Sequence, residues 1–176
     1  MSHDKLPKTT PQIDKLQLPA DPDWQTMDDV PSEFRQVVEL HMMAQRDGAY
    51  IDDVQRAPVS LDEVYETYDG WSAGQTVLVS RSDDGSIDGM FSYYFEKEGT
   101  PFLESVAVDP DVQGSGIGAA LIDEALEDLR ATSEAPYAIA RAQSRVLDIY
   151  TRRWGAEVLD SGDRNGYTKI AVPIPR

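Results

Sequence analysis

Apolar and polar residues along this chain follow two periods, which predict helices and strands in an interleaved order. Apolar residues recur every three to four positions in four segments, as on the buried side of an amphipathic helix. Shorter runs rich in β-branched and aromatic residues, bounded by glycine, proline or aspartate, indicate strands. The predicted helices are residues 28–47, 60–68, 119–130 and 144–154, and the predicted strands are residues 75–80, 87–95, 102–108, 137–142, 156–159 and 167–172.

Capping residues and glycines mark where these elements begin and end. Ser60 and Glu63 have the spacing of a capping box at the start of the second helix. Gly48 and Gly70 are predicted to end the first and second helices, because glycine is a poor helix former. Hairpin turns are predicted at residues 83–85 and 162–166, where aspartate and glycine are grouped.

The order of these elements predicts one α/β domain. Two helices are followed by three strands, a helix, a strand, a helix and a closing hairpin, which indicates a single mixed, mostly antiparallel sheet flanked by helices. The length of 176 residues is that of one ordinary domain. Residues 13–18 alternate too weakly to predict a strand, so residues 1–20 are expected to form a loosely ordered segment before a domain over residues 21–176.

Residues 102–130 are the most informative, because they predict a buried strand, a glycine-rich loop and an amphipathic helix in direct succession. Asp109-Pro110 ends the strand, and Gln113-Gly114-Ser115-Gly116-Ile117-Gly118 leads into the helix. With almost no side chains at the helix start, a ligand can approach the N–H groups of the first turn, where the helix dipole favours negative charge. A phosphate or pyrophosphate is therefore the expected ligand.

Other glycine-loop chemistries fit this segment less well. A P-loop needs a Lys-Ser/Thr pair after its last glycine, and Ala119-Ala120 follows instead. Gly114, Gly116 and Ala119 fit the dinucleotide motif G-x-G-x-x-A, but that motif turns directly from strand to helix, and here residues 109–113 intervene. A plain tight connection, with glycines chosen for backbone freedom, is the remaining alternative.

The pattern Gln-x-x-Gly-x-Gly over residues 113–118, preceded by VAVDPDVQ over residues 106–113, resembles the GNAT superfamily of N-acetyltransferases, and most of all the ribosomal-protein N-terminal acetyltransferases. The resemblance covers roughly residues 75–175. It implies a GNAT-like sheet with a V-shaped cleft between the fourth and fifth strands and acetyl-CoA as co-substrate. The residues that it implies for the pantetheine arm and pyrophosphate are Val106, Ala107, Val108, Gln113, Gly114, Ser115, Gly116, Ile117 and Gly118.

Transfer to an amine needs a group that takes a proton from the ammonium. Glu104 interrupts an otherwise apolar strand, and alternation places it on the face of Phe102 and Val106, so its carboxylate is expected in the cleft with a raised pKa. Polyamine acetyltransferases carry a similar Leu-Glu, which implies that Glu104 is the base. The alternative is a glutamate that faces solvent or pairs with an arginine. Ser80 and Ser115 lack a neighbouring base, and His41 on an early helix is expected to be a packing residue, so a hydrolase triad is unsupported.

The resemblance weakens in the last helix. The family pattern has an asparagine, a tyrosine seven residues later and a glycine four residues after that. Counting back from Gly155 places Thr151 at the tyrosine position and Ser144 at the asparagine position, which implies that Ser144 contacts the cofactor. Tyr150 is displaced by one residue, a rotation of about 100° on a helix. We expect Tyr150 as the second catalytic residue, with Thr151 as its alternative. The glutamate of the ribosomal-protein enzymes falls on Ile139, so their mechanism does not transfer intact.

Composition and charge limit the kinds of partner that the sequence predicts. The chain has 16 basic and 32 acidic residues, a net charge of −16, which disfavours nucleic acid and anionic membranes and suits a cationic acceptor or a solvated, halophilic surface. The absence of cysteine excludes a disulfide framework and a thiolate metal site, and no metal is expected. No apolar run reaches the about 20 residues of a membrane span, and the start lacks the apolar stretch of a signal peptide, so a cytoplasmic location is expected.

The sequence therefore predicts an acetyl-CoA-dependent N-acetyltransferase that acts on a primary amine of a small molecule, peptide or protein. Its expected partners are acetyl-CoA and the amine acceptor, and a homodimer is left open. Two alternatives remain, namely the transfer of a different acyl group and a non-catalytic acyl-CoA-binding sensor or regulatory module.

Overall fold

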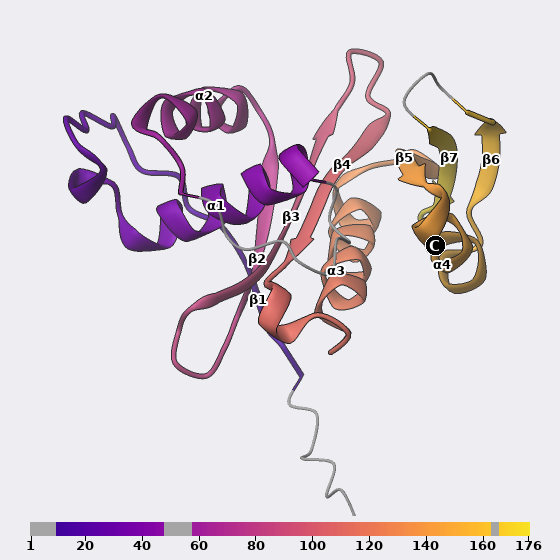
Figure 1. Cartoon of the computed structure of the whole chain (residues 1–176). Coiled ribbons are helices and arrows are strands. Elements are labelled where there is room, and N and C mark those ends of the chain that lie inside the picture. Colours follow the sequence, from indigo (N-terminus) through magenta and orange to yellow (C-terminus); the bar gives the residue numbers. More distant parts are fainter. Residues whose placement is uncertain (1–9, 48–57, 163–165) are drawn as a thin grey trace, which may run out of the picture.

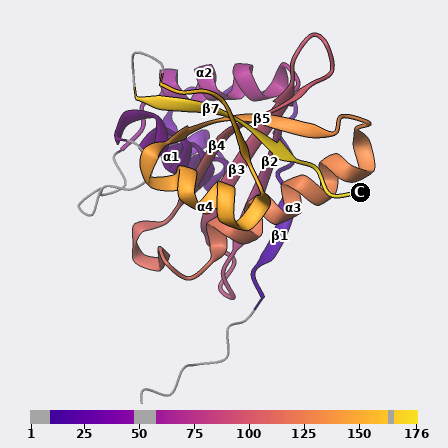
Figure 2. The same cartoon turned by 90° about the vertical axis from the view of Figure 1, so that its right-hand side faces the viewer.

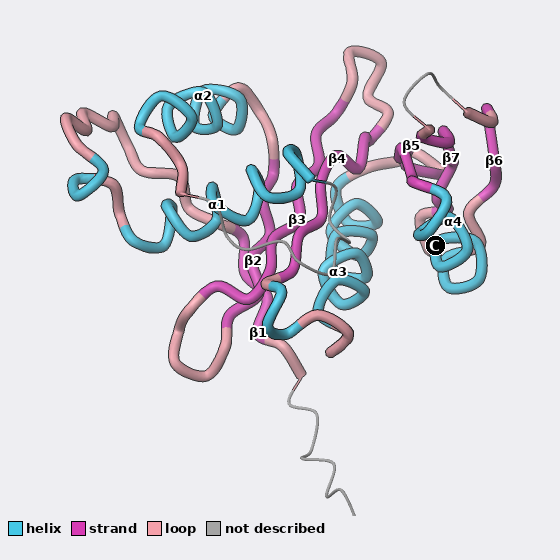
Figure 3. The backbone as a smooth tube through the Cα atoms, viewed as in Figure 1, coloured by secondary structure: helices cyan, strands magenta, loops and turns pink. Residues whose placement is uncertain are grey.

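The computed structural model describes residues 10–47, 58–162 and 166–176 and has the predicted α/β architecture (Figures 1 and 3). Its strands form one seven-stranded sheet in the order β1-β2-β3-β4-β5-β7-β6, in which only β4 and β5 are parallel neighbours. The strands are β1 (Gln12–Lys15), β2 (Thr76–Arg81), β3 (Ile87–Phe95), β4 (Pro101–Val108), β5 (Tyr137–Gln143), β6 (Glu157–Asp160) and β7 (Tyr167–Pro173). The helices are α1 (Ser32–Asp47), α2 (Leu61–Ser72), α3 (Ile117–Thr132) and α4 (Ser144–Trp154), with short 3-10 turns at Met27–Asp29 and Pro110–Val112.

Helices cover both faces of the sheet and form two separate cores. On one face, Val37 of α1 and Val64 of α2 are fully buried in what we call the α1–α2 core. On the other face, Leu121 and Leu129 of α3 are fully buried in the α3 core, and α4 packs against β5 and β7 (Figure 2). Because each helix buries only one side, the helical periodicity of the sequence produces this three-layer arrangement.

The sheet splits between β4 and β5. These strands pair only through Phe102 with Ile139 and Leu103 with Ala140, whereas β5 pairs with β7 along its whole length. Beyond the two pairs, β5, β6, β7 and α4 diverge from the rest of the molecule (Figure 1). The predicted V-shaped opening of the sheet is therefore confirmed.

A bulge in β4 changes the direction of its side chains. Tyr93 pairs with Leu103, while the residue before Tyr93 pairs with Ser105, so Glu104 is an extra residue on β4. Leu103 and Val106 both pack into the α3 core although they lie three residues apart, which regular alternation forbids. The bulge explains this reversal, because an extra residue shifts the pleat. The expectation that Glu104 and Val106 share one face is wrong for this reason.

Differences in the C-terminal half are limited to one or two residues at the ends of elements, and the larger remaining differences concern the N-terminal half. Residues 12–15 form β1, which pairs with the edge of β2, although their alternation was too weak to predict a strand. The capping box of Ser60 and Glu63 is confirmed, but α2 continues through Gly70. The predicted stop at Gly48, the centre of the predicted turn at residues 163–165 and residues 1–9 of the predicted N-terminal segment lie outside the described residues.

The α3 core is expected to be a main source of stability. Leu129 is fully buried, so Leu129→Ala should lower the free energy of unfolding by about 2–5 kcal/mol, because it removes apolar contacts and leaves a cavity. The control is Val158→Ala on β6, where the side chain is 51% exposed and the expected change is within about 0.5 kcal/mol. Denaturant unfolding measures both values, and equal small changes would contradict the assignment of this core.

Candidate active site

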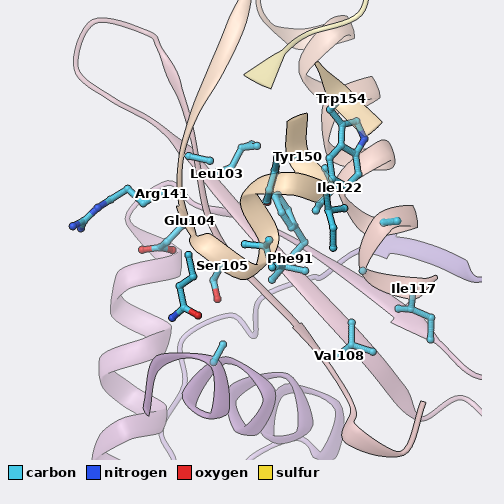
Figure 4. A pocket seen from close by; sticks show the side chains of 18 of the residues that line it. Phe91, Leu103, Glu104, Ser105, Val108, Ile117, Ile122, Arg141, Tyr150 and Trp154 are labelled. Atoms are coloured by element: carbon cyan, nitrogen blue, oxygen red, sulfur yellow. The ribbon is translucent and has the colours of Figure 1, made fainter. Parts of the chain in front are cut away.

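The divergence of β4 from β5 opens a cavity of about 760 Å³. Its walls come from β4, the glycine loop with the start of α3, β5 and one side of α4, with further residues from the end of α1 and from β7. Figure 4 shows Glu104 and Ser105 toward one end of this cavity and Val108 and Ile117 toward the other, with Tyr150 and Trp154 on the wall formed by α4. The cavity therefore joins the predicted anion site to the predicted base.

The glycine loop forms an uncapped helix N-terminus. Gly116, the N-cap residue of α3, has φ 94° and offers no side chain to cap the helix. The first main-chain bond there runs from the Ala120 N–H to the Gly116 carbonyl at 3.0 Å, so the N–H groups of Ile117, Gly118 and Ala119 have no acceptor within the helix. A Cβ atom at Gly116 would meet nothing within 4 Å, which means that the space above the loop is open. An anion can reach these amides.

The structure brings most of the predicted cofactor-binding residues to the cavity. Its lining includes Val106, Val108, Gln113, Gly114, Gly116, Ile117 and Gly118. Gln113 also donates from its side-chain amide to the Val108 carbonyl at 3.2 Å, which ties the loop to the end of β4. Three predicted residues do not line it: the side chain of Ala107 is buried in the α1–α2 core on the other face, and Ser115 and Ser144 are exposed elsewhere.

Glu104 lies at the bulge of β4, on the sheet face opposite α3. The Ser92 hydroxyl donates to its carboxylate at 3.2 Å, and nearby Phe102 stacks on Tyr94 with ring centroids 5.2 Å apart. Although Glu104 is exposed to the open cleft, desolvation by the surrounding protein raises the pKa of its carboxyl above the ordinary value. Hydrogen bonds from Ser92 and Gln75 oppose this rise. The expected direction of the pKa shift is confirmed.

The structure places Tyr150, and not Thr151, at the cavity. Tyr150 is only 8% exposed and lies on the same helical stripe as Val146 and Trp154, which also line the cavity. Its ring contacts that of Trp154, with centroids 5.1 Å apart. Thr151 is exposed and donates its hydroxyl to the Leu147 carbonyl at 2.9 Å. Packing of the apolar side of α4 therefore decides the helix rotation that residue counting left open.

Two of the arginines of α4, Arg152 and Arg153, bind acidic neighbours. Arg153 lies 2.6 Å from Asp123 of α3, which also accepts a hydrogen bond from the Trp154 indole at 2.7 Å, and Arg152 lies 3.0 Å from Asp148. The loop itself contains no lysine or arginine. Main-chain amides are therefore the principal anion ligands that this end of the cavity offers.

His41 packs away from the cavity, as expected for a packing residue. Its ring lies edge-on to Trp71, with centroids 5.3 Å apart, and burial lowers its pKa to about 4. Sequence reasoning missed Arg141 of β5 and Tyr167 of β7, which both line the cavity. The available signal for Arg141 was a single charged residue within a strand of small apolar residues.

A split α/β sheet with an uncapped helix N-terminus on one wall of its cleft forms a site that can bind a long ligand with an anionic group. Residues 35–155 match the model of the acetyltransferase (GNAT) family. The chain therefore belongs to the GNAT family of acetyltransferases, whose co-substrate is acetyl-CoA. The site fits this molecule, because the open space over Gly114 and Gly116 adjoins amides that can bind a pyrophosphate, and the end of β4 continues the cavity from there.

Several solved structures share this fold. A GNAT superfamily phosphinothricin acetyltransferase from Sinorhizobium meliloti, in complex with acetyl-CoA, is 18% identical, with 94% of this chain and 89% of that chain covered and a TM-score of 0.65. The yncA protein from Salmonella typhimurium, with its cofactor acetyl-CoA, is 18% identical, with 96% of each chain covered and a TM-score of 0.64. An acetyltransferase of the GNAT family from Staphylococcus aureus is 9% identical, with coverage of 94% and 100% and a TM-score of 0.63. At these identities the likenesses show the fold alone.

No curated protein matches the sequence. Among the described residues, no helix combines the length and the apolar character that a bilayer crossing requires. The nearer resemblance to the ribosomal-protein enzymes stays a prediction.

Binding of acetyl-CoA should depend on the backbone of Gly116. Gly116→Val forces a β-branched residue to adopt φ 94° and places a side chain over the amides, so we expect its affinity for CoA to be lost. Calorimetric titration with CoA measures this loss.

The matched control is Gly85→Val in the turn between β2 and β3. Gly85 has φ 85° and open space around it, but it lies outside the cavity. This variant carries similar backbone strain and should keep its CoA affinity. Unchanged affinity in a folded Gly116→Val variant would remove the assignment of the loop.

Proposed function

We propose that the protein is an N-acetyltransferase that moves the acetyl group of acetyl-CoA to a primary amine of a small molecule, peptide or protein. One observation carries the proposal: a carboxylate with a raised pKa borders the same cavity as the anion-binding loop. Removal of a proton from an ammonium requires a base, and a carboxylate whose pKa is raised is a stronger base than an ordinary one.

Glu104 and Tyr150 have complementary roles in this proposal. When bound, acetyl-CoA supplies an acetyl thioester whose carbonyl carbon is open to attack by an amine. Glu104 takes a proton from the acceptor ammonium, directly or through water, and so exposes the nitrogen lone pair. The nitrogen would form a bond to that carbon, and as the C–S bond breaks the Tyr150 hydroxyl would give its proton to the departing sulfur. The nitrogen would lose its second proton to solvent, from which Tyr150 is reprotonated, and Glu104 would release its proton to solvent after the product leaves. Both residues line the cavity, from β4 and α4 respectively.

The cofactor roles follow the shape of the cavity. We assign the loop amides of Gly114 to Gly118 to the pyrophosphate and the end of β4, Val106 to Val108, to the pantetheine arm. Ala107 can contribute only its main chain to the cavity side, because its side chain lies in the α1–α2 core. Ser115 and Ser144 do not line the cavity, so the geometry of the cavity does not support their predicted contact with the cofactor.

The alternatives make different demands on the same site. A non-catalytic acyl-CoA sensor needs the loop but no base, and the position of Glu104 beside the open cleft favours catalysis over sensing. Transfer of a longer acyl group would use the same residues. It would depend on whether the space beside Phe102 and Tyr94 can hold the longer chain. A cytoplasmic location and a homodimer are further expectations that do not alter the chemistry.

Removal of the base should slow turnover without weakening cofactor binding. Glu104→Gln keeps the shape of the side chain but cannot accept a proton, so we expect turnover to fall by about 100-fold and CoA affinity to stay the same. Glu157→Gln, an exposed residue on β6, is the matched control.

The dependence of turnover on pH provides a second test of Glu104 as the base. Glu104 must be ionised to act, and its pKa is raised, so wild-type turnover should fall as the pH drops through that raised value. Glu104→Gln should lack this contribution to the acidic limb. Turnover is followed as release of the CoA thiol, and wild-type activity in this variant would remove Glu104 from the mechanism.

Loss of the tyrosine hydroxyl tests the other half of the site. We expect Tyr150→Phe to lower turnover by about tenfold or more, because the leaving sulfur then lacks a positioned proton donor. Tyr137→Phe, whose ring is 42% exposed and lies outside the cavity, should leave turnover unchanged. Full activity of Tyr150→Phe would show that water supplies this proton.

A further inference from the structure

The acceptor end of the cavity carries two opposite charges. Among the described residues that line the cavity, only Glu104 and Arg141 have ionised side chains, although the chain contains 32 acidic and 16 basic residues. All other lining residues are apolar, aromatic or uncharged polar. Charged side chains are rarer in the lining of this cavity than in the chain as a whole. The one acidic and one basic side chain that the lining does contain therefore suit a ligand with one positive and one negative group.

Glu104 and Arg141 each directly follow the last residue pair between β4 and β5. Phe102 of β4 pairs with Ile139 of β5, and the strands are parallel. Arg141 lies between Ala140 and Ala142, which are buried in the α3 core, so alternation places its side chain on the opposite face of β5. Glu104 is on that same face of the sheet, where it accepts the hydrogen bond from Ser92. Figure 4 shows both side chains at the same end of the cavity.

Arg141 lies at the wrong end of the cavity to bind the pyrophosphate. Val108, where the strand reaches the glycine loop, lies four positions beyond Glu104, and four strand positions span about 13 Å. A group bound beside Arg141 is therefore near the proposed base and far from the amides of α3. The arginine belongs to the acceptor half of the site.

The arginine is also held in place. Its guanidinium lies over the Tyr167 ring, 5.5 Å from the centroid, and the Tyr167 hydroxyl accepts a hydrogen bond from the Gln143 side chain at 3.0 Å. Stacking uses the flat face of a guanidinium, while its five N–H donors lie in the plane. A carboxylate can therefore bind in that plane and share the guanidinium with the contacts that Arg141 already makes.

We propose that Arg141 binds a carboxylate of the acceptor, so that the acceptor is a small amino acid whose amine lies within a few bonds of its carboxylate. This inference rests on the proposed acetyltransferase function. It names Arg141 as a specificity-determining residue, with the ammonium of the same molecule directed to Glu104.

The first experiment compares acceptors on the wild-type protein. A panel of α-amino acids is tested with acetyl-CoA, each beside its own carboxamide, and kcat/KM is taken from release of the CoA thiol. We expect the best amino acid to exceed its carboxamide by about 10- to 100-fold, the range of a charge-assisted hydrogen bond. The amine of a carboxamide is less basic than that of the amino acid, so more of it is in the reactive, unprotonated form. This difference favours the carboxamide, so a preference for the amino acid cannot result from amine basicity.

The second experiment removes the arginine. Arg141→Gln should raise KM for the amino acid by about 10- to 100-fold, leave kcat/KM for the carboxamide unchanged and keep CoA affinity. Arg152→Gln is the matched control, because Arg152 is an exposed arginine that pairs with Asp148 outside the cavity. It should change none of these values.

The outcomes separate this inference from the function on which it rests. Turnover with equal kcat/KM for amino acids and carboxamides, or faster acetylation of long peptides, would overturn the inference and leave the acetyltransferase function standing. An equal loss for all acceptors in Arg141→Gln would also overturn it. No turnover with any amine would remove the proposed function and this inference together.

Discussion

The short contact between β4 and β5 is the constraint on which the site depends. Their pairing ends at Leu103 and Ala140, and beyond that point the main chain of β4 pairs with none of the described strands on this side. Asp123 of α3 provides a second link between the two parts, because it binds Arg153 and the indole of Trp154 on α4. A longer pairing would bring β5 against β4 and close the cavity. Together with the α3 core, which includes residues of β5, α4 and β7, these links hold the two parts of the split sheet together, while the sheet is open beyond Leu103 and Ala140.

Electrostatics in this cavity are local and do not follow the net charge. A protein of net charge −16 repels phosphate at long range, yet the uncapped first turn of α3 presents main-chain dipoles at short range. Near the other end, Glu104 and Arg141 place one charge of each sign in an otherwise uncharged lining. The acidic surface and the ligand site are thus separate features, and the acidic composition alone would have suggested a purely cationic acceptor.

Much of the fold followed from local patterns, whereas several features of the site did not. The bounds of α4 and β3 agree with the predicted ranges, because an apolar period and its flanking glycines are local properties. The bulge at Glu104 was not predictable, since it exists only in the register between β3 and β4. Counting favoured Thr151, whereas packing of α4 turned Tyr150 inward, and Arg141 gained significance only once β5 lay beside β4.

The sequence by itself determined the α/β class, the glycine loop with its anion-binding chemistry and the candidate base, because each depends on residue types at short spacing. Tertiary structure decided which face each side chain occupies and which distant residues share the cavity. Those outcomes depend on strand register, on the bulge and on helix rotation, which arise from packing between segments far apart in the chain. Short-range patterns can therefore identify candidate reactive groups in this chain, but only long-range pairing brings them together.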